Sequence, residues 1–257
     1  MLQTHAVQVA KIVVTHFHPD HVGAAAPLAE LTSAPVLQGT IDYAQCTRAW
    51  SGKDAIARLV AYMREHGLPS EDAEQLRVDG GVLLRLVHYA RDPQPLEPGD
   101  ELDGWEMLHL PGHADGHLAL LRDGVLIAGD VLLATITPTV GLYPDARPDP
   151  LGDYLDSLQR IVELAPVKAY AGHGDAIEDP PQRARELISH HEERLARTRE
   201  ALSTEPRTAY EVSLTLFPEP LTPVLRRFAL AETCAHLEYL ALRGEVFCDG
   251  LNGYAVA

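Results

Sequence analysis

Apolar residues fall into short runs whose period changes along the chain, and these runs predict alternating strands and helices. Val7–Val14 is rich in β-branched residues and predicts a linker or helix end that leads into a buried strand. The rest of the first half predicts a helix that ends at Leu31, a strand over Pro35–Gln38, one or two helices over Tyr43–Gly67 and a polar helix over Leu68–Asp79. The proline-rich passage Asp92–Gly99 then predicts a break in the regular pattern.

Short strands dominate the middle of the chain. The expected strands lie over Trp105–Leu110, Leu118–Leu121, Val125–Ala128 and Val167–Ala171. Asp123 and Gly124 form a hairpin signal between two of them, and apolar residues at helical spacing predict a helix over Asp153–Leu164. Because strands alternate with helices, the sequence predicts a layered α/β architecture.

The C-terminal part of the chain has a different character. The expected elements are a long charged helix over Arg183–Leu202, helices over Thr208–Leu216 and Val224–Arg243, and a β-hairpin of Glu245–Cys248 and Tyr254–Ala257. Three helices closed by a hairpin are the outline of a winged helix. We therefore expect two domains, residues 1–187 and a winged-helix-like module over residues 188–257, with the boundary near Ile188.

Composition restricts the functional class. The 257 residues are 46% hydrophobic, which is ample for a core and excludes disorder as the main state. No run of ~18 apolar residues indicates a membrane span, and the start lacks the basic and apolar regions of a secretory signal. We therefore expect a soluble, cytoplasmic protein without a membrane partner. The net charge of −16 disfavours a nucleic-acid partner, although a local basic groove could exist. Three widely spaced cysteines are expected to be reduced, Cys46, Cys234 and Cys248.

The clearest chemical signal comes directly after the first expected strand, where four metal-ligand side chains occur in the order H-x-H-x-D-H. His16 and His18 share one side of an extended chain because side chains repeat there with period two. A tight turn would then bring Asp20 and His21 beside them. Imidazole and carboxylate ligands suit zinc, with iron or manganese as alternatives.

Four ligands cannot complete two metal sites, so further ligands should follow later strands. His113, Asp130 and His173 each follow an expected strand, and each has a glycine beside it. A glycine permits the sharp backbone turn that aims a side chain back over the sheet edge. The sequence therefore predicts that residues far apart in the chain meet at one metal centre.

These four motifs, in this order, resemble the metallo-β-lactamase superfamily, and the resemblance extends from Val7 to about Gly174. It implies an αββα sandwich and two divalent metal ions, with zinc expected first. It implies that one ion is held by His16, His18 and His113, the other by Asp20, His21 and His173, and that Asp130 bridges both. It also implies a hydrolase whose nucleophile is a hydroxide held between the metals. Asp20 and Asp130 are the expected catalytic residues because they would hold that nucleophile in place.

The other histidines carry no ligand pattern. His117 is expected to contact a ligand or to have a structural role, and His109 to pack within its strand. Phe17 and Tyr143 are candidates for lining a substrate pocket, against the default that aromatic residues belong to the core. The remaining histidines are interpreted as surface or packing residues: His5, His66, His88, His190, His191 and His236.

The N-terminal flank is short for this resemblance. Superfamily members carry several strands before the H-x-H-x-D-H motif, whereas only fifteen residues precede His16 here. We therefore expect a truncated chain, a misassigned start or a first sheet that lacks its first strands. Loss of those strands would leave a sheet edge open, and a homodimer through that edge is one expectation.

The segment Ile136–Pro144 and the helix after it are similar to the branch that contains hydroxyacylglutathione hydrolase-like and lactamase-like endoribonuclease proteins, which often end in a winged helix. From His190 to Ala257 the chain has seven arginines, no lysine and ten acidic residues, a balance of −3. A protein that binds double-stranded nucleic acid needs a row of basic residues on its recognition helix, which this module does not clearly show. We therefore interpret the module as a packing or dimerisation module that forms a wall of the active site.

Three functions follow as hypotheses. The first is a dinuclear metal-dependent hydrolase of a small ester or thioester, as in hydroxyacylglutathione hydrolases. The second is a metal-dependent endoribonuclease, because the same chemistry cleaves phosphodiesters. The third is a non-catalytic winged-helix regulator whose metallohydrolase domain senses a ligand. Antibiotic β-lactam hydrolysis is disfavoured because it usually goes with export, and the sequence shows no export signal.

Overall fold

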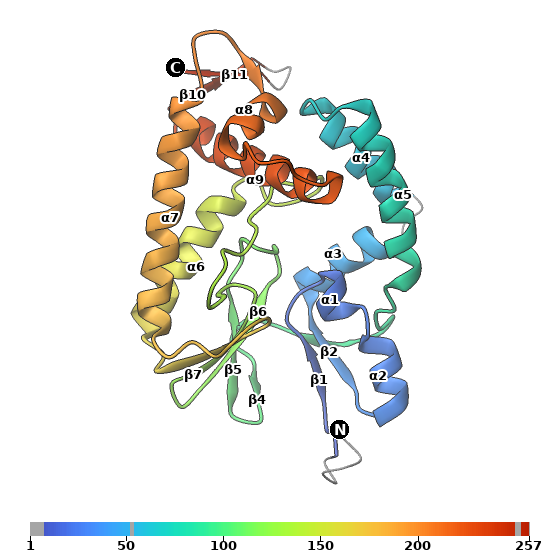
Figure 1. The fold of residues 1–257 in the computed structure, drawn as a ribbon. Helices are drawn as coiled ribbons and strands as arrows, with labels where there is room; N and C mark the ends of the chain where they lie inside the picture. The colour runs from blue at the N-terminus through green and yellow to red at the C-terminus, as the bar shows by residue number, and fades with distance from the viewer. Residues whose placement is uncertain (1–7, 52–53, 250–252, 257) are drawn as a thin grey trace.

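Two β-sheets pack face to face and helices cover their outer faces, which gives four layers (Figure 1). The structure, a computed structural model, describes residues 8–51, 54–249 and 253–256. Beside the first sheet lie α1 (Pro19–Val22), α2 (Ala25–Thr32) and α3 (Thr40–Trp50), and beyond the second lie α6 (Pro150–Leu164) and α7 (Pro180–Glu200). The α/β class predicted from the sequence is confirmed.

The first sheet is parallel, in the order β1-β2-β3, and consists of β1 (Ile12–Val14), β2 (Val36–Gly39) and β3 (Gln94–Leu96). β3 falls within the proline-rich passage, so the predicted break is wrong there. Pro95 pairs with Gln38, and the proline is accommodated because β3 lies at an edge of the sheet, where a residue without an N–H is tolerated. β1 forms the other edge.

The second sheet has the order β4-β5-β6-β7-β8 and is antiparallel except for the parallel pair β7 and β8. Its strands are β4 (Glu101–Leu102), β5 (Trp105–His109), β6 (Leu118–Arg122), β7 (Val125–Gly129) and β8 (Lys168–Ala171). Asp123 and Gly124 have φ values of 49° and 76° between β6 and β7. These left-handed values are those of a tight two-residue hairpin, so the predicted turn is confirmed.

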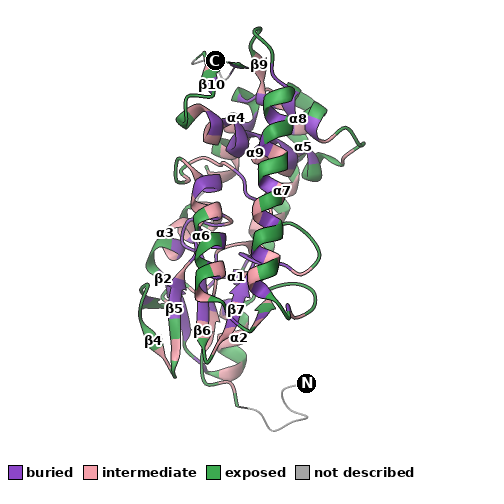
Figure 2. Ribbon diagram, turned by 90° about the vertical axis from the view of Figure 1, so that its left-hand side faces the viewer, coloured by how far each residue is buried: buried purple, intermediate pink, exposed green. Residues whose placement is uncertain are grey.

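Apolar side chains fill the space between the sheets and under the helices. Leu37 and Leu96 of the first sheet join one buried cluster with Met107, Leu118 and Leu120 of the second. Figure 2 shows buried residues along β6 and β7 and exposed residues along the outer faces of α6 and α7. The two sheets are therefore held together by a shared apolar core.

The loop after β5 lies directly against α6. Gly112 has a φ of 125°, and a Cβ at this position would lie 2.5 Å from the Cα of Tyr154. Only glycine permits both this conformation and this approach. Because Tyr154 is itself fully buried, the contact fixes the loop that carries His113.

Helices α4 (Ala55–Glu65) and α5 (Ser70–Leu86) form an antiparallel pair, and α5 continues beyond the predicted end at Asp79. The extension passes through two glycines. Gly80 faces Ile56 of α4, where an added Cβ would lie 3.2 Å from the Ile56 side chain. The absence of a side chain at Gly80 therefore allows the two helices to pack closely.

The C-terminal part contains α8 (Ala209–Leu216), α9 (Pro223–Leu242) and a small sheet of β9 (Arg207–Thr208), β10 (Val246–Cys248) and β11 (Gly253–Val256). α8 begins with a capping box, in which Glu211 N donates to Thr208 Oγ1 and Thr208 N donates to the Glu211 carboxylate. The expected domain boundary near Ile188 lies inside α7, which is continuous. α9 contacts α4, α5, α6 and α7, so one core connects both parts of the chain.

A buried histidine pair joins α7 to α9. His191 Nδ1 lies 3.2 Å from His236 Nε2, and His236 Nδ1 donates to the carbonyl of Glu232 at 2.8 Å. A neutral His236 that donates through Nδ1 accepts through Nε2, so His191 is the donor within the pair. Burial lowers the pKa of His191 to about 3 and the pKa of His236 to about 4.

Acid should therefore weaken the packing of α7 against α9. Both pKa values lie below the ordinary value of 6.5, so the pair contributes its full stability above pH 6.5 and loses it as the pH falls towards 4. Each histidine removes up to about 1.4 kcal/mol of unfolding free energy per pH unit in that window. The variant His191→Asn keeps a side-chain donor but cannot titrate. Its unfolding free energy in urea should fall less between pH 7 and pH 5 than that of the wild type, and an equal fall would contradict a neutral pair.

The described cysteines form no disulfide, as expected: Cys46 and Cys234 are buried, and Cys248 is half-buried. No helix in the described part of the chain combines the length and the apolar character that crossing a membrane requires. α7 has 21 residues, but charged residues occur along its whole length.

Candidate metal centre

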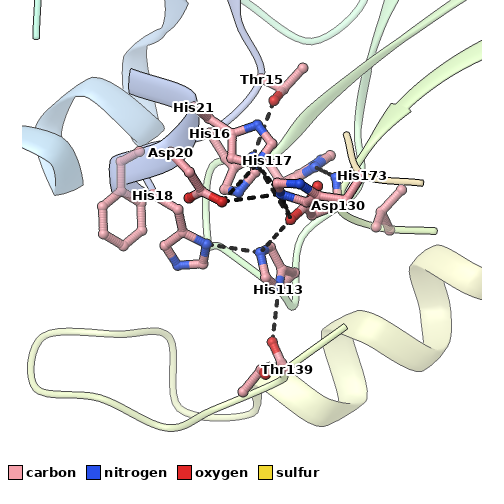
Figure 3. Close-up of polar contacts among 12 residues, drawn as sticks. Thr15, His16, His18, Asp20, His21, His113, His117, Asp130, Thr139 and His173 are labelled. Atoms are coloured by element: carbon pink, nitrogen blue, oxygen red, sulfur yellow. Dashed lines mark hydrogen bonds and ion pairs between the residues drawn. The ribbon is translucent and has the colours of Figure 1, made fainter. Parts of the chain in front are cut away.

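Seven side chains from both sheets converge where strands end (Figure 3). His16 and His18 follow β1, Asp20 and His21 lie in α1, His113 follows β5, Asp130 follows β7 and His173 follows β8. They are the seven residues that the sequence motifs predict to be metal ligands. The structure brings all of them together, although the strand ends that carry them are distant in sequence.

The short helix α1 turns the H-x-H-x-D-H motif back on itself. Pro19 occupies its first position, and the backbone N–H of His21 donates to the carbonyl of His18 at 3.0 Å. Proline suits this position because a first-turn N–H has no partner within the helix. The turn brings the His21 ring to 4.0 Å from the His16 ring, centre to centre. The tight turn predicted from the sequence is thus one turn of helix.

His16, His18 and His113 form the first potential metal-binding group, with one ligand nitrogen from each within 4.8 Å of the others. His18 Nδ1 lies 2.8 Å from His113 Nε2. His113 Nδ1 donates to the carbonyl of Thr139 at 2.8 Å, which in the neutral ring leaves Nε2 free to bind a metal. His16 Nε2 is buried and has no hydrogen-bond partner among the described residues.

Asp20, His21 and His173 form the second group. His21 Nε2 and His173 Nε2 are 3.2 Å apart, and His173 Nε2 lies 3.1 Å from Asp20 Oδ2. The side chains of Asp20 and His173 are 55% and 47% exposed, whereas those of the first group are largely buried. Asp20 and His173 therefore face the solvent, whereas the side chain of His21 is only 13% exposed.

Asp130 lies between the two groups. Its Oδ2 is 3.4 Å from His21 Nε2, 3.4 Å from His173 Nε2 and 3.8 Å from His113 Nε2. The other carboxylate oxygen, Oδ1, is buried without a hydrogen-bond partner in the described part of the chain. One carboxylate therefore approaches members of both groups, which is the place that a bridging ligand occupies.

The spacing of the donor atoms fits metal coordination. Two ligand atoms bound to one tetrahedral zinc ion at about 2.0–2.1 Å lie about 3.3 Å apart. Five pairs of these donor atoms are separated by 2.8 Å to 3.8 Å, close to that value. Buried donors without partners, His16 Nε2 and Asp130 Oδ1, are unfavourable unless something binds them. The donor set therefore fits two divalent metal ions.

The protonation states also suit metal binding. Burial, followed by repulsion from neighbouring histidines, lowers the pKa of His16 and of His18 well below 6.5. Burial alone would raise the pKa of Asp130, but its hydrogen bond with His21 and the nearby histidines hold it below its usual value. For His21, burial lowers the pKa, but the hydrogen bond to Asp130 and its charge outweigh burial and raise the pKa above the ordinary value. Neutral imidazole and ionised carboxylate are the forms that bind metal.

Two residues that sequence reasoning missed hold the ligand loops. The buried carboxylate of Asp42, in the first turn of α3, accepts hydrogen bonds from Phe17 N at 2.9 Å and from Gln38 Nε2 at 2.6 Å. Phe17 lies between the first two ligands, so Asp42 fixes their backbone. Thr139 orients His113 through its carbonyl. The position of Asp42, an acidic residue in the first helical turn after a buried strand, is a signal that the sequence offers. Thr139 acts through its backbone carbonyl, which every residue has, so the sequence offers no signal for it.

The remaining histidines behave largely as expected. His117 Nε2 accepts from the backbone N of Asp130 at 3.1 Å, so it contacts a ligand residue, as predicted. His109 Nε2 lies 2.7 Å from the carbonyl of Asp115 at the end of β5. His66 is buried beside the Tyr62 ring. His5 lies outside the described residues.

A cavity of about 510 Å³ opens beside these ligands, and His18, Asp20, His113 and Asp130 form part of its wall. Most of the wall is apolar and comes from α3, α4, α5, α9 and the loops around residues 17 and 143. Its larger apolar residues include Phe17, Trp50, Ile56, Leu83, Tyr143 and Phe228. The prediction that Phe17 and Tyr143 line a pocket is confirmed. A cavity of this size accommodates a small organic molecule.

Comparison with protein families gives two matches. The Metallo-beta-lactamase superfamily matches residues 2–173, and the family described as "Metallo-beta-lactamase-like, C-terminal domain" matches residues 195–248. The first match contains all seven converging residues. The second covers the end of α7, both following helices and β10.

Individual relatives agree with the family matches. A metallo-beta-lactamase family protein from Thermus thermophilus has a crystal structure with a TM-score of 0.84 and 40% identity, and the match covers 97% of this chain and 80% of that one. The probable metallo-hydrolase YqjP of Bacillus subtilis is 28% identical over 90% of this chain and 75% of its own length. A Passalora fulva protein named atrochrysone carboxyl ACP thioesterase is 23% identical over 89% of this chain and 57% of its own. The chain spans about half the length of several other curated relatives.

Proposed function

This chain belongs to the metallo-beta-lactamase superfamily and is a hydrolase of that fold, and we propose that it cleaves small esters or thioesters with two divalent metal ions. The proposed activity is of the hydroxyacylglutathione hydrolase type. The observation that carries the proposal is an apolar cavity that opens onto the cluster of histidine and aspartate ligands.

The proposed metal assignment follows the two groups of donors. His16, His18 and His113 would hold one ion, Asp20, His21 and His173 the other, and Asp130 would contact both. Imidazole and carboxylate donors favour zinc, and iron or manganese fit the same donors. The two ions would acidify a water molecule and polarise the carbonyl oxygen of the substrate.

The protein side chains would orient the reactants. Asp20 and Asp130 line the cavity, and their carboxylate oxygens can accept hydrogen bonds from the attacking water. The reaction forms a bond from the water oxygen to the acyl carbon and breaks the bond from that carbon to the leaving sulfur or oxygen. The leaving thiol or alcohol takes one proton of the water, and the acyl group leaves as a carboxylic acid. No serine or cysteine nucleophile is needed in this scheme.

The character of the cavity supports an acyl substrate over a polynucleotide. Its walls are largely apolar, so they favour a hydrocarbon segment by the hydrophobic effect. The net charge of −16 opposes the approach of a phosphate backbone. The name of the Passalora fulva relative, a thioesterase, agrees with this substrate class.

We also propose that residues 188–257 form a winged-helix-like module that walls the cavity of a catalytic domain over residues 1–187. α9 supplies Val224, Arg227 and Phe228 to the lining. The charge balance of −3 from residue 190 onwards gives no clear basic stripe for a nucleic acid. A wall of the cavity is therefore the role that the contacts support.

A comparison of substrates tests the proposal. Protein supplied with zinc, iron(II) or manganese should hydrolyse S-lactoylglutathione or S-octanoyl-N-acetylcysteamine and leave single-stranded RNA intact, and His18→Ala should abolish the thioester activity. Thiol release can be followed with a thiol reagent. Cleavage of RNA without thioester turnover would support an endoribonuclease instead. Salt-sensitive binding of duplex DNA with no turnover of either substrate would support a regulator.

A further inference from the structure

α9 presents one cationic side chain to the cavity. Val224, Arg227 and Phe228 line it, and their spacing places them on one face of the helix. The guanidinium carbon of Arg227 lies 4.2 Å from the centre of the Phe228 ring. The aromatic face therefore supports the guanidinium at the cavity wall.

Among the residues that the structure describes, Arg227 has no acidic partner. Its Nε is buried without a hydrogen-bond partner, and Arg227 takes part in no ion pair among residues 8–51, 54–249 and 253–256. The adjacent Arg226 differs, because its guanidinium donates to the carbonyls of Phe217 and Glu219. A buried donor without an acceptor is unfavourable, so a ligand acceptor would stabilise Arg227.

The other arginines of the cavity are differently placed. Arg58 Nε lies 3.4 Å from Asp145 Oδ2, so its charge is balanced within the wall. Arg48 lines the cavity from α3 but is largely exposed. Arg227 and His18 line the same cavity, so a ligand that contacts Arg227 lies in the space that opens onto the ligand cluster.

We propose that Arg227 binds an anionic group of the substrate while the apolar walls hold the segment between that group and the scissile carbonyl. This inference rests on the proposed function, because the ligand is the substrate of the same site. The substrate class is an ester or thioester that combines an apolar chain with a carboxylate, sulfonate or phosphate. The planar guanidinium suits such groups because it donates two parallel hydrogen bonds to one oxyanion. The anion belongs either to the acyl part or to the leaving group.

A binding experiment tests Arg227 without turnover. Titration calorimetry on the metal-loaded protein compares 1-octanesulfonate with 1-octanol, which has the same chain and no charge. The sulfonate should bind roughly 10- to 100-fold more tightly. Arg227→Gln should abolish that difference, and Arg227→Lys should retain part of it. Equal affinity of Arg227→Gln and wild type for the sulfonate would overturn the proposal.

Matched variants separate the site from general charge effects. Arg160→Gln removes an arginine from the surface of α6, and it should bind the sulfonate as the wild type does. Arg48→Gln tests the exposed arginine of the same cavity. Loss of the sulfonate preference in Arg48→Gln but not in Arg227→Gln would overturn the assignment to Arg227. If a variant keeps the metal content and the melting temperature of the wild type, loss of folding is excluded. If Arg227→Gln unfolds, Arg227→Met is used in its place.

Kinetics then locate the anion on the substrate. Three thioesters are compared: neutral S-octanoyl-N-acetylcysteamine, its ω-carboxyoctanoyl counterpart, and S-octanoyl-3-mercaptopropionate. At least one anionic thioester should exceed the neutral one about tenfold in kcat/KM, and Arg227→Gln should remove that advantage while the neutral thioester is still cleaved. An advantage that survives in Arg227→Gln would overturn the proposal. No turnover of any thioester by the wild type would instead reject the proposed function, and the sulfonate titration would still decide the role of Arg227.

Discussion

Replacing Asp130 with asparagine is expected to lower kcat/KM for thioester hydrolysis at least ~100-fold. The reason is its position, because Asp130 Oδ2 lies within 3.8 Å of histidines from both ligand groups. Asparagine has nearly the same shape but no charge, so it cannot balance two divalent ions. Steady-state kinetics on protein prepared in the presence of the preferred metal measure the effect.

A matched control for Asp130→Asn is Asp156→Asn, because Asp156 is an exposed residue of α6 outside the cavity. The control should keep wild-type kinetics and wild-type stability. Full activity of Asp130→Asn at a metal concentration that saturates the wild type would reject a role for this carboxylate in holding the metals or the nucleophile.

The variant Gly172→Ala is expected to lose most of its activity although no ligand is replaced. A Cβ at this position would overlap Asp130 Oδ1 and lie 2.7 Å from His21 Cε1. The backbone cannot easily retreat, because Gly172 N donates to the carbonyl of Gly129 at 2.7 Å. The ligands must therefore move, and a displacement of about 1 Å at a reacting centre lowers the rate about 100-fold. Kinetics and metal affinity should both decline.

Gly81→Ala is the matched control, since a Cβ at Gly81 of α5 would meet no atom within 4 Å. Alanine there should leave activity unchanged and slightly raise the melting temperature, because it favours the helix. Gly172→Ala should retain the far-ultraviolet circular dichroism of the wild type. Wild-type metal affinity in that variant would show that the close approach of Gly172 to the ligands is unimportant.

The ligand cluster was predictable from the sequence because each ligand follows a strand. β5, β7 and β8 of one sheet run in the same direction, so His113, Asp130 and His173, which follow them, can be expected to meet at a common edge. The approach of His16, which follows β1 of the other sheet, depends on the packing of the two sheets. The hairpin at Asp123 and Gly124 was predictable for a local reason, namely the left-handed backbone that this pair readily adopts. These features depend on short segments, in which pattern and conformation are directly linked.

Features that depend on packing between distant segments could not be predicted. β3 forms across Pro95 only because it lies at a sheet edge, and strand order is not visible in a single sequence. The buried role of Asp42 depends on the backbone of Phe17, in another segment. Arg227 and Phe228 reach the cavity because α9 packs across α4 and α5. The sequence around Arg227 and Phe228 contains no motif that indicates a binding site.

The central claim is that this ligand cluster holds two divalent metal ions, and metal content per chain tests it most directly. Protein purified without chelator is analysed by mass spectrometry of its metals, beside His18→Ala and Asp130→Asn. The account predicts about two ions of zinc, iron or manganese per wild-type chain and clearly fewer in both variants. Wild-type protein that holds no metal after incubation with each of these ions, or variants that hold as much as the wild type, would contradict it.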